Sequence, residues 1–248
     1  MINFVNSKMN RFTYKEWNAY FTCNDSRRPV IDFSEEKGLS EKEIIRIAPS
    51  IQAFQTGESS DGKHLLKAAG DFADRIGQAD YRDVMRRFVK EENRHAGYLR
   101  KFMDYYQIKA GKRSYLDHIF RRLRQLGGIR CEAMVLVTAE MIALTYYDAL
   151  ANNTDSFALK SICRQMLRDE IPHVMFQSYT LSHFKSGKTD RIVRILLMET
   201  ALFFVWVSFH QVYQAGGYGI VRYMKENLGY LRQSLILTES NSKSSRLL

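Results

Sequence analysis

Two short segments of this chain carry the same residue types in the same order. Glu91–His95 reads EENRH and Asp169–His173 reads DEIPH, so each has an acidic residue followed by Glu-x-x-His. Residues three apart share one face of an α-helix, so the glutamate and histidine of each segment can reach the same metal ion. Carboxylates with imidazoles suit iron or manganese, whereas a structural zinc site favours cysteine. The repeated spacing predicts a metal site that two helices build together.

Apolar residues at helical spacing predict four long helices around these segments, over roughly 49–77, 80–106, 129–151 and 155–185. In each helix a glutamate interrupts the apolar stripe, and in the second and fourth a histidine follows one turn later. An ionised carboxylate in an apolar interior loses much of its hydration energy unless a partner compensates it. The interrupting residues are Glu58, Glu92, His95, Glu140, Glu170 and His173.

These six residues match the ligand set of a dinuclear metal site. One glutamate from each of two helices, with Glu-x-x-His from each of two others, holds two iron or manganese ions in four-helix bundles. The four glutamates bring four negative charges, which two divalent cations neutralise. The sequence therefore predicts two iron ions as the cofactor, with manganese as the alternative.

Three further acidic residues need an interpretation. Glu132 is the alternative to Glu140, but it lies near a helix start, where a carboxylate is favourable for another reason. Glu140 is the only charge between Ala133 and Tyr147, and we prefer it as the ligand. Glu91 and Asp169 each precede a ligand glutamate. We expect each to accept a hydrogen bond from the non-ligating nitrogen of the histidine on the facing helix, with solvent exposure as the alternative.

Residues 50–185 resemble the ferritin-like di-iron superfamily on Glu58, Glu140 and the two Glu-x-x-His motifs. This superfamily includes ferritins, rubrerythrins, ribonucleotide reductase small subunits and soluble acyl-carrier-protein desaturases, and the motifs are most similar to those of the desaturases. The resemblance implies an all-α, ferritin-like four-helix bundle with a long crossover and additional N- and C-terminal helices. It also implies that Glu92 and Glu170 bridge two irons, with Glu58 and Glu140 as terminal or bridging ligands.

The resemblance implies a non-haem di-iron oxidoreductase that activates O₂, of the oxygenase, oxidase or desaturase kind, acting on a small hydrophobic or acyl-type substrate. No flavin, nucleotide or iron–sulfur motif is present, so electrons would come from a separate donor such as ferredoxin. The net charge of +10 would suit that donor or an acidic carrier protein. No nucleic-acid module signature accompanies the basic residues, and we expect no nucleic-acid partner.

Two other function classes stay open. One is metal oxidation or peroxide reduction of the ferritin or rubrerythrin kind, without an organic substrate. The other is a non-enzymatic helical interaction protein in which the motifs are coincidental. Three scattered cysteines cannot build the four-cysteine site of rubrerythrins, and together with the lack of a secretory leader they predict a cytoplasmic protein.

The chain divides into four predicted parts: a lead-in over 1–48, the metal-binding bundle over 49–185, additional helices over 186–237 and a disordered tail over 238–248. The apolar stretch 195–209 is shorter than the ~20 residues that span a bilayer. It predicts no membrane span, but a buried helix, a homodimer interface or a cover for a substrate channel.

Several single residues also carry expectations. Pro49 should lie in the first turn of a helix, and Pro172 should kink the fourth helix. Tyr146 and Tyr147 should pack in the core rather than carry a radical. The remaining histidines should be surface or core residues rather than ligands; these are His64, His118, His183 and His210.

Overall fold

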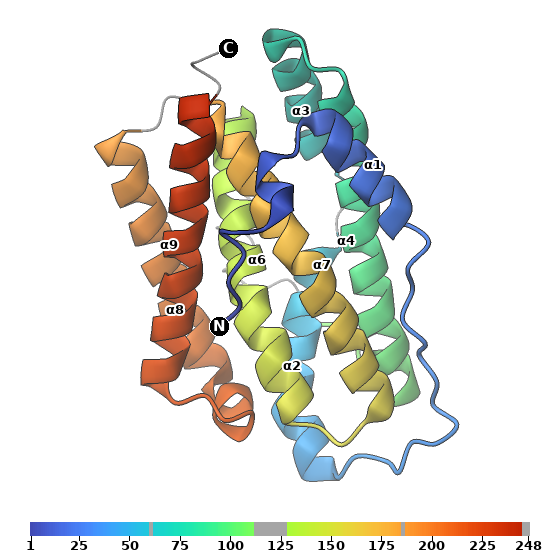
Figure 1. The fold of residues 1–248 in the computed structure, drawn as a ribbon. Helices are drawn as coiled ribbons and strands as arrows, with labels where there is room; N and C mark the ends of the chain where they lie inside the picture. Colours follow the sequence, from blue (N-terminus) through green and yellow to red (C-terminus); the bar gives the residue numbers. More distant parts are fainter. Residues whose placement is uncertain (60–61, 112–127, 185–186, 245–248) are drawn as a thin grey trace.

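The computed structural model describes residues 1–59, 62–111, 128–184 and 187–244. Its regular secondary structure in these residues is entirely helical, which confirms the predicted all-α class (Figure 1). After a short 3-10 helix at Lys8–Arg11, the helices are α1 (Tyr14–Asn24), α2 (Glu41–Glu58), α3 (Lys63–Ile76), α4 (Asp80–Tyr105), α6 (Gly128–Asn152), α7 (Phe157–Ser182), α8 (Lys188–Ala215) and α9 (Ile220–Ser244).

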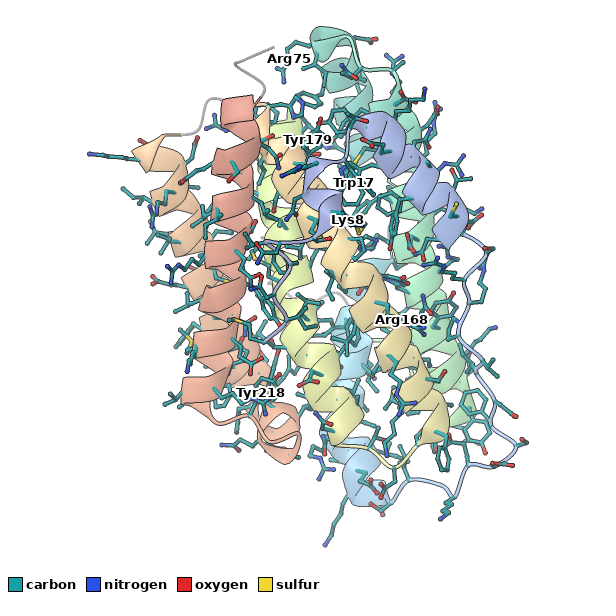
Figure 2. All side chains as sticks on the ribbon, viewed as in Figure 1. Lys8, Trp17, Arg75, Arg168, Tyr179 and Tyr218 are labelled. Atoms are coloured by element: carbon teal, nitrogen blue, oxygen red, sulfur yellow. The ribbon has the colours of Figure 1, made fainter. Side chains whose placement is uncertain are left out.

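Helices α6 and α7 pair closely along the middle of the molecule. Helix α4 packs on α2 and α7, and α1 lies across α4. On the opposite side, α8 and α9 pack on α6 (Figure 1). Trp17, labelled in Figure 2, joins α1 to the bundle because its ring packs on that of Phe176 in α7, with 5.8 Å between centroids. The centre of the molecule is therefore enclosed by α2, α4, α6 and α7, with α1 as a cover.

The predicted single helix over 49–77 is wrong, because the chain forms two helices there. The Ser40 hydroxyl caps α2 by accepting from the Glu43 N–H, and the Ser40 N–H donates to the Glu43 carboxylate in return. Helix α2 therefore begins at residue 41, and Pro49 lies inside it rather than in its first turn. The helix ends at Glu58, and Gly62 has φ 63° before α3 begins. A Cβ on Gly62 would lie 2.6 Å from Val89 Cγ1. The left-handed backbone and the close approach of α4 both separate α2 from α3.

Helix α7 runs from Phe157 to Ser182 and continues through Pro172, the position of the predicted kink. A non-helical residue lies instead in α8, where Phe209 has φ −134°. Periodicity located both helices, but it does not show where a helix bends.

The predicted disorder of 238–248 is wrong for residues 238–244, because α9 continues to Ser244. Thr238 is buried, and its hydroxyl donates to the Ser234 carbonyl at 2.9 Å and accepts from Arg194 of α8. The tail end 245–248, and most of the long crossover after α4 with His118, lie outside the described residues.

Two helices are long and apolar enough to cross a membrane by length and composition alone. In α6, 89% of the apolar window is buried, as expected for a core helix. In α8 only 22% is buried, although the helix has 28 residues. The apolar stretch 195–209 is thus part of a long helix that is largely exposed, and the prediction of a buried helix there is wrong.

Candidate metal centre

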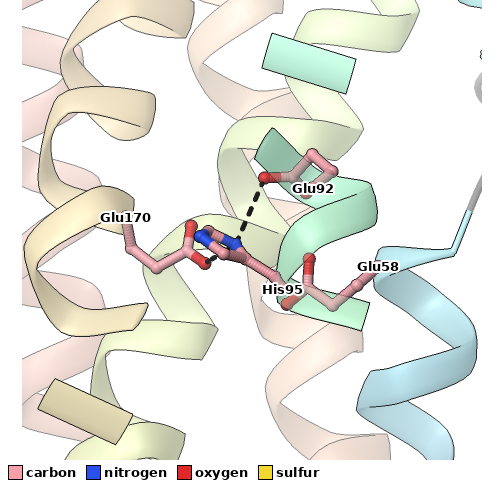
Figure 3. Close-up of side chains that lie close together, drawn as sticks. All are labelled: Glu58, Glu92, His95 and Glu170. Atoms are coloured by element: carbon pink, nitrogen blue, oxygen red, sulfur yellow. Dashed lines mark ion pairs between the residues drawn. The ribbon is translucent and has the colours of Figure 1, made fainter. Parts of the chain in front are cut away.

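The six predicted ligand residues meet at the centre of the bundle, and we call them the Glu/His cluster. They come from the last residue of α2 and from the middle of α4, α6 and α7. Figure 3 shows four of them converging from α2, α4 and α7. The cluster consists of Glu58, Glu92, His95, Glu140, Glu170 and His173.

The cluster divides into two overlapping groups whose ligand atoms lie within 4.8 Å of one another. One group joins Glu58 and His95 to Glu92 and Glu170, and the other joins Glu140 and His173 to the same two glutamates. Five members are buried, and the Glu92 side chain is 12% exposed. The two shared carboxylates sit where two neighbouring cations would have common ligands.

Both histidines turn the same ring nitrogen toward the shared carboxylates. His95 Nδ1 is 3.5 Å from Glu170 Oε1 and 3.7 Å from Glu92 Oε1. His173 Nδ1 is 3.1 Å from Glu92 Oε1 and 3.2 Å from Glu170 Oε2. Each Nδ1 is thus directed at the centre that the glutamates surround.

The opposite nitrogens face Asp169 and Glu91, which we call the outer carboxylates. His95 of α4 donates from Nε2 to Asp169 Oδ2 of α7 at 3.0 Å. His173 Nε2 of α7 lies 3.6 Å from Glu91 Oε2 of α4. The contacts cross between the helices. The His95–Asp169 bond agrees with the expectation from the sequence, whereas the His173–Glu91 distance exceeds a hydrogen bond and His173 Nε2 has no hydrogen-bond partner among the described residues. A carboxylate bonded to Nε2 holds the proton on that atom and leaves Nδ1 as the ligand atom, which the Asp169 contact supports for His95.

Two residues that support the outer carboxylates were not predicted. Asn24, buried at the end of α1, donates its amide to Glu91 and, at 2.9 Å, to Asp169 Oδ1. Gln165 donates to both oxygens of Asp169, at 3.0 and 2.9 Å. Gln165 could have been found one turn before Asp169 on the same helix. Asn24 lies on a separate helix, and no spacing in the sequence points to it.

Burial, together with charge repulsion in the cluster, raises the pKa of two glutamates. Burial, reinforced by Glu92 and Glu170, holds the pKa of Glu58 well above its usual range, and the same causes act on Glu140. Burial would also raise the pKa of Glu170, but hydrogen bonds with Glu140 and the two histidines outweigh it and lower that pKa. Protons on some of these carboxylates therefore offset the negative charge that cations would otherwise balance.

The pKa values of both histidines in the cluster are also raised. Burial alone would lower their pKa values, but the hydrogen bond to Asp169 and the nearby carboxylate of Glu170 raise that of His95 well above its usual range. The hydrogen bond to Glu170 and the nearby carboxylates of Glu91 and Glu92 do the same for His173. The site as a whole attracts positive charge strongly enough to overcome the desolvation of two imidazolium rings.

Several buried atoms at the centre have no hydrogen-bond partner: His95 Nδ1, Glu92 Oε1 and Glu170 Oε1. A buried polar atom without a partner costs about 1–3 kcal/mol, and more when it is charged. All three point at the shared centre, and carboxylate oxygens and imidazole nitrogens are ligand atoms for iron or manganese. The residues present therefore fit a pair of such ions.

Tyr147 of α6 lies against the cluster. Its hydroxyl donates to Glu58 Oε1 at 2.8 Å, and the side chain is fully buried. Tyr146 instead donates to Ser50 Oγ at 3.0 Å and stacks on Phe54. Both tyrosines are core residues, and Tyr147 is also in contact with a predicted ligand.

Glu132, the alternative to Glu140, does not belong to either ligand group. Its Oε1 lies 2.9 Å from Nδ1 of His64, a half-exposed residue of α3. His183 stacks on Tyr14 and lies outside both ligand groups, as does His210. Among the described residues, the remaining histidines thus lie outside the cluster.

Neither a protein-family model, a curated protein nor a solved structure matches this chain. The functional conclusion therefore depends on the chemistry and geometry of the cluster.

Proposed function

We propose that this chain is a non-haem di-iron oxidoreductase with a ferritin-like bundle of α2, α4, α6 and α7, and that it activates O₂ to oxidise a small hydrophobic or acyl-type substrate. Manganese is the alternative metal. The observation that carries the proposal is the pair of overlapping buried ligand groups that share Glu92 and Glu170.

Each residue of the cluster has a distinct task in this proposal. Glu58 and His95 would hold one ion, Glu140 and His173 would hold the other, and Glu92 and Glu170 would serve both. Four carboxylates and two divalent cations give a neutral centre, which removes the cost of burying the charges. When bound, two irons would supply the electron-transfer chemistry that reduces O₂ and oxidises the substrate.

The rest of the chain prepares the site for such chemistry. The helices limit the access of bulk water, because five members of the cluster are buried and the Glu92 side chain is only 12% exposed. The outer carboxylates keep the protons on the Nε2 atoms, so that both Nδ1 atoms remain ligands. The Tyr147 hydroxyl donates a hydrogen bond to Glu58 Oε1, and the second oxygen of that carboxylate would be left for a metal ion.

An external electron donor such as ferredoxin, or an acidic carrier protein, is part of the proposal. The net charge of +10 favours acidic partners. A surface hollow on α4, lined by Asp83, Arg86, Arg87 and Lys90, lies on the helix that carries Glu92 and His95. Its three cations support docking of an acidic protein at this helix.

Oxygen consumption tests the proposed activity. Iron-loaded protein with a chemical reductant is expected to consume O₂ faster when fatty-acyl compounds are added, and to yield an oxidised organic product detected by mass spectrometry. Glu92→Gln should abolish this consumption, whereas Glu132→Gln should retain it because Glu132 pairs with His64 outside the cluster. Turnover of hydrogen peroxide with no effect of any organic compound would contradict the proposal and favour peroxide reduction.

A further inference from the structure

Helix α8 exposes a continuous apolar surface along its length. Four large residues point outward, with exposed fractions between 55% and 63%: Ile192, Leu196, Phe203 and Val207. At about 100° per residue, these four lie within an arc of about 60° on the helix. By their helical positions, the arc extends on one side to Thr200, Val193 and Phe204. We call this surface the α8 arc.

The opposite side of α8 attaches the helix to the bundle. Arg194 is 3% exposed and donates to Ser234 and to Thr238 of α9. Met198 and Leu202 are fully buried on the same side. If α8 left the bundle to cross a bilayer, the Arg194 guanidinium would lose these hydroxyl partners in an apolar medium, at high cost. The α8 arc therefore needs a cover that leaves the helix in place.

The charges around the α8 arc favour a protein as that cover. The exposed cations Lys188 and Arg191 lie only at its first turn. From Ile195 to Ala215 the chain has no lysine or arginine, and the only charged side chain is Glu199 at one edge of the arc. Helices that lie on anionic bilayers carry lysine and arginine beside their apolar face. A central apolar region depleted in charge, with polar residues at its edge, is typical of protein interfaces.

We propose that the α8 arc is covered by a second copy of this chain, with the two α8 helices antiparallel about a two-fold axis between Thr200 and Phe203. The exposed residues Val193, Leu196, Thr200, Phe203 and Val207 alternate at spacings of three and four, which is the spacing of helices that pack knobs into holes. The spacing of these residues therefore fits packing against another helix.

The antiparallel register follows from size and charge. About this axis the small Thr200 lies opposite the large Phe203 of the other copy, and Leu196 lies opposite Val207. Lys188, at the start of α8, comes beside the uncharged end near Gln214. A parallel pair would instead place the two Lys188 side chains next to each other and the two Phe203 rings against each other.

The size of the α8 arc sets the expected strength of the dimer. A helix of 28 residues is about 42 Å long and about 11 Å wide, so the pair covers on the order of 900 Å² in total. Interfaces below about 1,200 Å² belong to weak or transient complexes. The dimer is therefore expected to dissociate on dilution.

Sedimentation velocity of the full chain from about 1 to about 200 µM tests the proposal. The sedimentation coefficient should rise from that of a monomer to that of a dimer. Phe203→Glu should weaken the dimer about 100-fold or more, because it places a charge in the centre of the interface. The matched control is Phe157→Glu on α7, because Phe157 is 58% exposed and lies away from the arc. The dimer affinity of this variant should equal that of the wild type. A monomer at every concentration, or an unaffected Phe203→Glu dimer, would overturn the proposal.

Crosslinking tests the orientation. With exposed Cys23 replaced by serine, Leu196→Cys and Val207→Cys chains should crosslink when mixed, and each alone should crosslink weakly. Crosslinks confined to like chains would overturn the antiparallel register. If the protein stays monomeric and instead floats with phosphatidylglycerol vesicles in a manner that Phe203→Glu abolishes, the arc binds a bilayer and the dimer is rejected.

Discussion

Asn24 lies on α1, away from the helices that carry the Glu/His cluster, and yet its amide contacts both outer carboxylates. Each outer carboxylate in turn faces a histidine of the cluster. One side chain thus controls the position of two imidazoles. The types and spacing of the ligand residues could be predicted because each ligand interrupts an apolar stripe. The support from Asn24 could not, because it depends on how α1 packs across α4.

Replacing Asn24 with leucine should therefore weaken metal binding. The outer carboxylates lose a donor, and loss of such support typically costs about 10- to 100-fold in metal affinity. Competition of Co²⁺ between the protein and a coloured chelator measures the change. Asn18→Leu is the control on the same helix, because Asn18 contacts Arg87 rather than the outer carboxylates. Equal affinity in the two variants would show that Asn24 has no part in the site.

At the level of helices, prediction succeeded where a long apolar stripe is continuous. The structure places α4, α6 and α7 within about three residues of the predicted bounds. It failed at residues 49–77, because the apolar spacing of α2 and α3 agrees by chance across Gly62. It also failed for the environment of α8, since periodicity identifies a helix but not which of its faces remains uncovered.

The break between α2 and α3 places Glu58 at a helix end, and Gly62→Ala should disturb it. Alanine resists the positive φ of this position, and its Cβ would overlap Val89. We expect a loss of more than about 1 kcal/mol in the free energy of unfolding, measured by urea denaturation. Gly57→Ala is the control, because no atom lies within 4 Å of its Cβ and φ is not positive. It should be neutral or stabilising by about 0.5–1 kcal/mol. A Gly62→Ala chain as stable as wild type would contradict the role of the turn.

For the molecule as a whole, the cluster links stability to pH. Glu58, Glu140, His95 and His173 all have pKa values above their ordinary values of 4.5 and 6.5 in the fold. The folded chain therefore binds more protons than the unfolded chain at neutral pH, and stability falls as pH rises. The lowered pKa values of Glu170 and Asp169 act only below about pH 4 and do not change this sign.

The metal-free protein should accordingly show a falling Tm between about pH 5 and about pH 8, measured by differential scanning fluorimetry in chelator. Bound metal should reverse the trend, because cations replace the protons on these ligands and bind more tightly as pH rises. A Tm that rises with pH in chelator would contradict the charge balance of the cluster.

The most direct test of the central claim is the metal content of the purified chain after anaerobic loading with Fe²⁺ and desalting, measured by inductively coupled plasma mass spectrometry. The geometry of the shared carboxylates predicts about two irons per chain, falling to near zero when Glu92 and Glu170 are both replaced by glutamine and unchanged in Glu132→Gln. Less than one iron per chain in the wild type, or full retention in the double variant, would contradict it.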